Sequence, residues 1–202
     1  MVAIARRPQA TAHAPCLKAF RADVLDGASL VGSVEGANAV ISCIGPAKNF
    51  SPGTVVSEGT SKIVAACQRA GVRRFVMQSG ITLSKGDELS IGNRWAIRIL
   101  RQIFSTACND KAIAERVVQQ SDLDWVIVRP AGLRETAPSS RYTAGPKARI
   151  APLAPLSFRT ALTALFAQRP TLRGQGRSFQ WPCTQDKNFH QSSRAFLPVR
   201  AG

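Results

Sequence analysis

The stretch TSKIVAACQRAGVRRFVMQSG, residues 60–80, decides the fold. Its first half belongs to a helix predicted over residues 54–70, because apolar side chains recur there at helical spacing and Gly71 follows as a stop. Its second half, residues 74–80, is a short apolar strand that ends in glycine. A helix that turns directly into a buried strand is typical of a parallel α/β sheet.

The same alternation extends to both sides of this stretch. Residues 39–45 have the composition of a strand that is buried on both faces. The other predicted strands cover residues 2–5, 17–22 and 124–128, the last stopped by Arg129-Pro130, and the other predicted helices cover residues 26–34, 91–104, 109–120 and 156–168. Because strands that alternate with helices pair in parallel through right-handed crossovers, the predicted fold class is α/β with a doubly wound parallel sheet.

The composition is that of an ordinary globular chain. Its 202 residues are 45% hydrophobic and 19% charged, which is enough for one domain with a real core. No apolar run is long enough to cross a bilayer, and Arg6-Arg7-Pro8 interrupts the N-terminus where a signal peptide would need apolar residues. We therefore expect a cytoplasmic protein without a membrane partner.

The five cysteines are scattered and form no C-x-x-C pair, and the chain has only two histidines. Because a structural zinc site needs clustered soft ligands, no metal site is predicted. We expect reduced thiols, with Cys43 buried in a strand and Cys67 buried in a helix.

The net charge of +15 is concentrated in the last third of the chain, because residues 136–202 contain 10 basic residues and only one acidic residue. Residues 134–156 resemble a loop, and no strand or helix is predicted beyond residue 169. We therefore divide the chain into a domain of residues 1–168 and a basic, irregular tail of residues 169–202, either a natural tail or a product of a shifted reading frame. The basic residues are dispersed, which disfavours a nucleic-acid partner.

Three segments together resemble one family. The stretch 60–80, the pair of segments 109–116 and 122–133, and the strand of residues 40–45 follow one another in the order and spacing of the atypical short-chain dehydrogenases/reductases. The resemblance is to the NAD(P)H-binding branch that includes NmrA-like and biliverdin- and flavin-reductase-like proteins. It covers residues 2–168 and implies a Rossmann-like fold that binds a nicotinamide dinucleotide.

The resemblance also implies that one part of the fold is absent from the sequence. The first glycine is Gly27, and no G-x-G-x-x-G turn occurs, although this turn and the helix after it hold the cofactor pyrophosphate. Residues 2–6 correspond to the family's second strand, so its first strand, glycine-rich turn and first helix would precede Met1. We expect a truncated chain or a misplaced start with impaired cofactor binding; the alternative is a lineage that has lost binding.

On the resemblance, the first two strands carry the contacts to the adenosine half of the cofactor. Arg6 and Arg7 lie where a guanidinium accommodates the 2′-phosphate, which favours NADP(H) over NAD(H). Asp23 and Val24 correspond to the contact with the adenine ring. The alternatives are solvated arginines and an aspartate that caps a turn.

The later strands carry the implied contacts to the nicotinamide half. Ser79 and Lys111 are the weak candidates for catalysis, although Lys111 is equally well explained as an exposed lysine paired with Glu115. The further residues implied to bind the cofactor are Cys43, Ile44, Gly45, Pro130, Ala131, Gly132 and Leu133.

The orthodox catalytic pair Tyr-x-x-x-Lys is absent, because Ala107 stands four residues before Lys111. Alcohol or carbonyl chemistry, which needs that tyrosine as an acid or base, is therefore disfavoured. Hydride transfer to a flavin or quinone-like small-molecule acceptor needs less help from the protein. The alternatives are an NAD(P)H-sensing regulator without turnover and an inactive truncated product.

Overall fold

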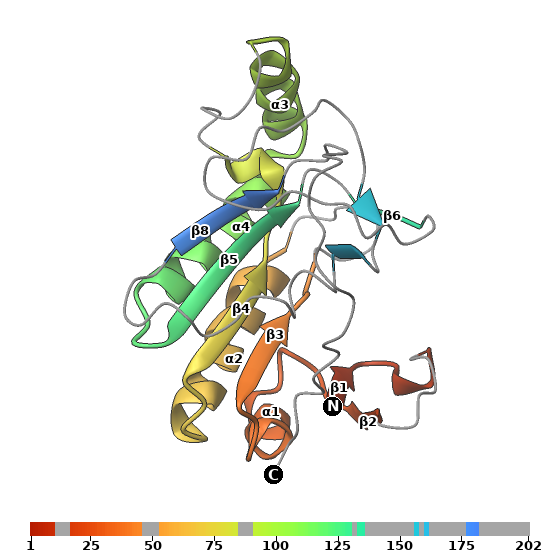
Figure 1. Ribbon diagram of the computed structural model, residues 1–202, viewed down its shortest axis with the longest axis vertical. Coiled ribbons are helices and arrows are strands. Elements are labelled where there is room, and N and C mark those ends of the chain that lie inside the picture. Colours follow the sequence, from red (N-terminus) through yellow and green to blue (C-terminus); the bar gives the residue numbers. More distant parts are fainter. Residues whose placement is uncertain are drawn as a thin grey trace, which may run out of the picture.

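The computed structural model describes residues 1–10, 17–45, 53–84, 91–130, 133–135, 156–157, 160–161 and 177–181. Its main feature is a parallel sheet of four strands in the order β3 (Ala39–Ser42), β4 (Arg74–Gln78), β5 (Asp124–Pro130) and β8 (Arg177–Trp181) (Figure 1). The parallel arrangement and the helices between the strands confirm the predicted α/β class.

Two smaller parallel sheets accompany the main one. Strand β1 (Val2–Ala5) pairs with β2 (Lys18–Arg21), and β6 (Leu133–Arg134) pairs with β7 (Leu156–Ser157). Within the described residues, no strand joins the β1–β2 pair to the four-stranded sheet.

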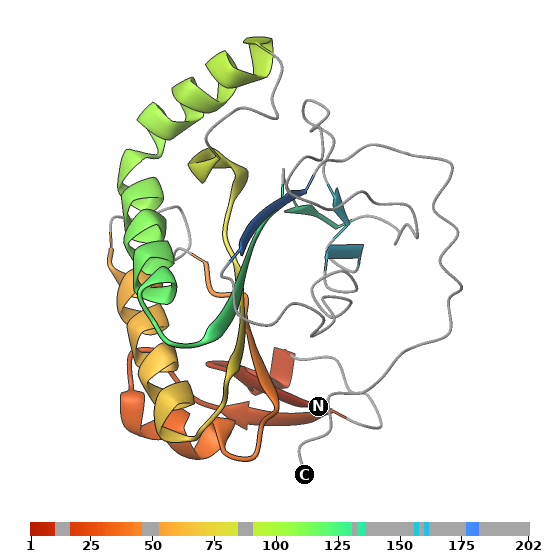
Figure 2. The same ribbon diagram turned by 60° about the vertical axis from the view of Figure 1, so that its left-hand side comes forward.

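The helices cover one side of the four-stranded sheet. They are α1 (Gly27–Val34), α2 (Val55–Arg69), α3 (Ile91–Ile103) and α4 (Ser105–Gln119), with short 3-10 helices η1 (Pro8–Ala10) and η3 (Ile81–Leu83). Helices α1, α2 and α4 lie on the same side of the sheet, whereas α3 extends away from it (Figure 2). The core lies between these helices and the two central strands, where Phe75, Met77 and Ile127 are completely buried.

The structure corrects several predicted boundaries. Strand β5 does not stop at Val128 but continues through Arg129 and Pro130, which pair with β8. The pairing of β5 with β4 already ends at Val128. Proline has no backbone N–H, but Pro130 therefore removes no hydrogen bond between β5 and β4. Helix α4 begins at Ser105, four residues before its predicted start.

The last third also differs from the expectation. Residues 156–157 form a strand where the start of a helix was predicted, and residues 133–134, at the start of the predicted loop, pair with them. Strand β8 lies in a region where we predicted none. Its sequence alternates apolar Phe179 and Trp181 with polar Ser178 and Gln180, a strand pattern that the strongly basic surroundings obscured.

Candidate functional site

The predicted site residues follow the carboxyl ends of successive parallel strands. Arg6 follows β1, Asp23 lies two residues after β2, Cys43 follows β3 and Ser79 follows β4, while Pro130 ends β5. The ends of β3, β4 and β5 are aligned, since Ser42 pairs with Met77 and Gln78 pairs with Val128. Open α/β sheets bind ligands at this edge. The structure thus places these residues along the edges where the fold binds ligands.

Lys111 is brought to this edge from helix α4. A β-carbon built on Gly80 would lie 3.5 Å from Nζ of Lys111, so the lysine tip is beside the segment that follows β4. Burial lowers the pKa of Lys111, while its interactions with Cys108 and Glu115 act in the opposite direction. The partly buried position argues against the alternative of an ordinary exposed helix lysine.

The segment that follows β4 is itself fixed to β5. The backbone N–H of Ser79 donates to the carbonyl of Val128 at 2.7 Å, and the side chain of Ser79 is only 2% exposed. The side-chain oxygens of Ser79 and of Ser42, the last residue of β3, are both buried, and neither has a hydrogen-bond partner within the described part of the chain. Buried hydroxyls without partners are uncommon.

Asp110 is a structural residue that sequence reasoning missed. Its two carboxylate oxygens accept from the backbone N–H groups of Val56 at 3.0 Å and Ser57 at 2.9 Å, and its side chain is buried. It thereby caps the N-terminus of α2, where Thr54 makes no side-chain cap bond. The predicted helix of residues 109–120 would instead put Asp110 in the first turn of its own helix. Because α4 begins at Ser105, the carboxylate instead serves α2 and fixes the turn that carries Lys111.

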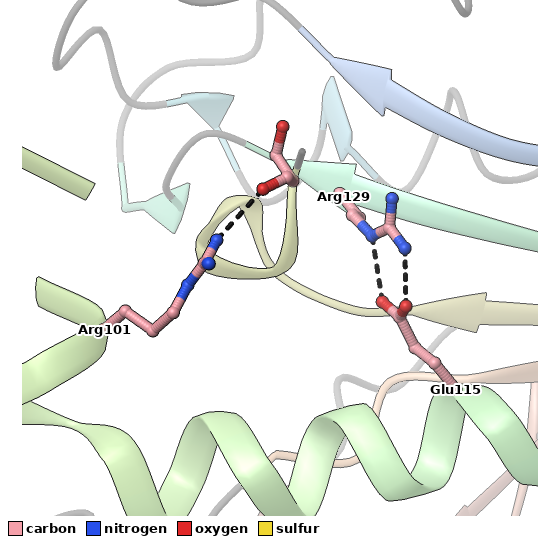
Figure 3. A network of polar contacts seen from close by, with 4 residues as sticks. Arg101, Glu115 and Arg129 are labelled. Atoms are coloured by element: carbon pink, nitrogen blue, oxygen red, sulfur yellow. Dashed lines mark hydrogen bonds and ion pairs between the residues drawn. The ribbon is translucent and has the colours of Figure 1, made fainter. Parts of the chain in front are cut away.

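A buried ion pair fixes the other end of the same region. The guanidinium of Arg129 donates to both carboxylate oxygens of Glu115, at 2.9 and 2.5 Å, and both side chains are at least nine-tenths buried (Figure 3). The pair joins α4 to the carboxyl end of β5. Glu115 lies one helical turn after Lys111, so the same helix face holds the lysine and its anchor. The sequence pattern marks Arg129 only as the stop of the predicted strand 124–128.

Val24 and Ile44, two of the residues predicted to contact the cofactor, both pack against Gly59 of helix α2. A β-carbon built on Gly59 would lie 2.9 Å from Cγ2 of Val24 and 3.3 Å from Cδ1 of Ile44. Only glycine therefore lets the segments after β2 and β3 approach the helix this closely. Gly59 was not singled out from the sequence, and its only signal was a glycine inside a helical pattern.

Three of the four residues predicted to contact the adenosine half, namely Arg6, Arg7 and Asp23, are exposed, whereas Val24 is half-buried. Arg6 and Arg7 lie on the surface after β1, where a ligand can reach them. Asp23 is also exposed, and its Oδ1 accepts from the N–H of Leu25 at 3.0 Å. The structure thus shows the turn interaction that was the alternative for Asp23, and its role toward a cofactor stays a prediction.

The remaining predicted site residues lie in different settings. Pro130 is buried at the end of β5, and Leu133 begins β6. Ala131 and Gly132 lie outside the described residues. Cys43 and Gly45 are exposed and Ile44 is half-buried, so the expectation that Cys43 is buried within a strand is wrong: β3 ends one residue earlier, at Ser42.

Among the described cysteines, burial raises the pKa of the Cys43 and Cys67 thiols. Cys67 is completely buried in α2, as predicted, and burial raises its pKa to about 11. Among the described residues, no three His, Cys, Asp or Glu side chains are grouped as a metal site would require.

The sequence matches, over residues 1–152, the family described as NAD(P)H-binding. This chain therefore belongs to that NAD(P)H-binding family.

Two curated relatives are longer than this chain. The uncharacterized protein At2g34460, chloroplastic, of Arabidopsis thaliana is 30% identical over 138 residues, which are 66% of this chain and 49% of the relative. The UPF0659 protein YMR090W of Saccharomyces cerevisiae is 34% identical over 80 residues, 40% of this chain and 31% of the relative. The chain thus spans half or less of the length of these relatives.

Solved structures with similar folds include reductases. The oxidoreductase ylbE from Lactococcus lactis matches with a TM-score of 0.67 at 18% identity. The match covers 90% of this chain and 78% of the ylbE chain. A short-chain dehydrogenase/reductase from Veillonella parvula, solved in complex with NADP, has a TM-score of 0.61 at 20% identity over 82% and 72% of the two chains. ChuY, an anaerobillin reductase from Escherichia coli O157:H7, has a TM-score of 0.63 at 16% identity over 88% and 79%. At such identities the similarity concerns the fold.

Proposed function

We propose that this protein binds NADPH along the carboxyl ends of its strands and reduces a flavin or quinone-like acceptor. The observation that carries the proposal is the position of Lys111, whose Nζ lies beside Gly80, two residues after the end of β4. Ser79, the residue before Gly80, has a buried hydroxyl. Membership of the NAD(P)H-binding family supports the binding of a nicotinamide dinucleotide. The preference for NADPH and the identity of the acceptor are the proposed parts.

The preference for NADPH rests on the end of β1. Arg6 and Arg7 are adjacent and exposed, and each offers a planar set of donors that matches a phosphate. They would hold the 2′-phosphate, while Asp23 and Val24 would border the adenine.

The nicotinamide half would lie at the ends of β3, β4 and β5. There the ammonium of Lys111 would donate to ribose hydroxyls, and the hydroxyl of Ser79 would orient the ring or the acceptor. When bound, the reduced nicotinamide supplies a hydride. The Glu115–Arg129 pair and Asp110 keep α4, and therefore Lys111, in place.

The class of acceptor follows from what is missing beside Lys111. Ala107 stands where a short-chain dehydrogenase has its catalytic tyrosine, so no acid is supplied from that position. A reduced flavin or hydroquinone can take its proton from water, whereas reduction of an unactivated ketone needs a positioned acid. The same absence supports the second candidate, a sensor that binds NADPH without turnover.

The test is anaerobic oxidation of NADPH by the purified chain, followed by the loss of NADPH absorbance with a flavin or a soluble naphthoquinone as acceptor. We expect acceptor-dependent oxidation that Lys111→Met lowers by about tenfold or more, because the ribose loses a charged donor. The matched control is Lys18→Met, which removes an exposed lysine of β2 and should retain the activity. Binding of NADPH without oxidation would contradict the reductase and favour the sensor.

A further inference from the structure

Helix α3 is attached to the rest of the molecule by its basic side. The guanidinium of Arg101 donates from Nε to the carbonyl of Thr82 at 2.9 Å and from Nη2 to the carbonyl of Ser84 at 3.0 Å. Figure 3 shows Arg101 with one of these two bonds. These contacts hold α3 to η3, and the helix extends beyond the end of the sheet (Figure 1). Ile97, near Arg101 on the helix surface, is half-buried.

The apolar side of α3 is exposed instead. Trp95, Ile99 and Ile103 follow one another at four-residue spacing and therefore lie on one face of the helix. Their side chains are 60%, 57% and 66% exposed, and the neighbouring Leu100 is 37% exposed. A surface helix of a globular protein normally turns such a face toward the core. Here the orientation is reversed, which indicates that something else covers the face.

The charge of α3 indicates the nature of this partner. The helix contains Arg94, Arg98 and Arg101 and no acidic residue. The guanidinium of Arg98 lies 5.3 Å from the ring centre of Trp95, so a cation stands beside the exposed aromatic side chain. A second copy of this chain is a poor partner, because a symmetric contact between two α3 helices would bring their arginines together without any acidic residue of α3 to pair with them. A surface that combines apolar groups with negative charge fits both features.

We propose that α3 binds the surface of an anionic lipid bilayer, with Trp95, Ile99 and Ile103 inserted at the boundary between headgroups and acyl chains. Arg98 would then pair with lipid phosphates at the edge of the inserted face. Apolar residues with an aromatic side chain on one face and arginines on the other are typical of helices that lie in the membrane interface. The proposal departs from the expectation of no membrane partner, which rested on the lack of an apolar run long enough to cross a bilayer. No helix among the described residues is long and apolar enough to cross a membrane, but binding in the plane of the surface requires none.

The test is co-sedimentation of the purified chain with phosphatidylcholine vesicles that contain roughly one third phosphatidylglycerol, compared with vesicles of phosphatidylcholine alone. We expect binding to the anionic vesicles that is at least about tenfold stronger than to the neutral ones and that weakens as salt is added. Ile99→Glu should lower this binding by about tenfold or more, because it places a carboxylate in the inserted face. Ile99→Leu, which keeps the face apolar, and Gln119→Glu, which adds the same charge at the exposed end of α4, should bind as the original chain does.

Three results would overturn the proposal. The first is the absence of binding to anionic vesicles by the folded chain. The second is binding that Ile99→Glu leaves unchanged, since another surface would then be responsible. The third is a dimer in light scattering that Ile99→Glu dissociates, which would show that a second copy covers the face. Circular dichroism checks that each variant is folded, which is expected because Ile99 is exposed.

Discussion

The β1–β2 pair and the four-stranded sheet carry the two halves of the proposed cofactor site, yet they are built very differently. Every residue of β2 is exposed, and Phe20 in its centre is 48% exposed. In contrast, Phe75 and Met77 of β4 are completely buried. Because burial of apolar side chains supplies most of the stability, the four-stranded sheet and its helices should determine folding. The β1–β2 pair should contribute mainly to the choice of cofactor.

The largest expected effect is the loss of the buried ion pair in the four-stranded part. Glu115→Ala leaves the guanidinium of Arg129 buried without its partner, so we expect the free energy of unfolding to fall by about 3–5 kcal/mol. Urea denaturation measures this change. The control Glu35→Ala removes an exposed carboxylate after α1 and should cost less than about 0.5 kcal/mol. Equal effects of the two variants would contradict the assignment of stability to this region.

A smaller loss is expected when α2 loses its cap. Asp110→Ala leaves the N–H groups of Val56 and Ser57 without their acceptor, which should cost about 2–4 kcal/mol. The same denaturation experiment applies, with Asp122→Ala as an exposed control. A cost below about 0.5 kcal/mol would show that α2 does not depend on α4 for its cap.

Lys111 should give the four-stranded part a distinctive dependence on pH. Burial lowers the pKa of Lys111 from 10.5, so the unfolded chain holds this proton more tightly than the folded one. Stability should therefore rise with pH between the lowered pKa and 10.5. The free energy of unfolding of Lys111→Met, compared with that of the original chain over this range, isolates the effect. A difference between the two proteins that stays constant with pH would contradict the buried position.

The smallest effect on stability is expected in the β1–β2 pair. Replacing both Arg6 and Arg7 by Ala should change the free energy of unfolding by less than about 0.5 kcal/mol, because both side chains are exposed. The same double variant should lower the ratio of NADPH to NADH affinity by about tenfold. Arg116→Ala, which removes an exposed arginine of α4, controls for the loss of charge. A large loss of stability without a change in selectivity would reverse the roles that we assign to the two sheets.

The regions also differ in how far the sequence predicted them. The helices and strands of residues 39–130 were predicted well because each has a clear apolar period bounded by glycine or charge. The failures at 133–134, 156–157 and β8 concern strands of two to five residues, whose stability comes from pairing with distant partners rather than from local pattern.

The location of the candidate site is easier to infer from the sequence than the contacts that hold its elements together. The carboxyl ends of the strands could be located, because parallel strands align their ends once the fold class is known. The contacts that hold α4 in place could not be located from the sequence. The bonds from Asp110 to α2 and from Glu115 to Arg129 join residues that are 53–54 and 14 positions apart, and no local spacing marks them. The role of Gly59 could not be predicted for the same reason, since it depends on two side chains from other segments.

The most direct test of the central claim is a titration of the purified chain with NADPH and with NADH, followed by nicotinamide fluorescence. We predict saturable binding in the micromolar range, tighter for NADPH, weakened by Lys111→Met and unchanged by Lys18→Met. Weakening by Lys111→Met would place the nicotinamide half at the end of β4. A folded chain that binds neither dinucleotide would contradict the proposal that the two sheets together form a cofactor site.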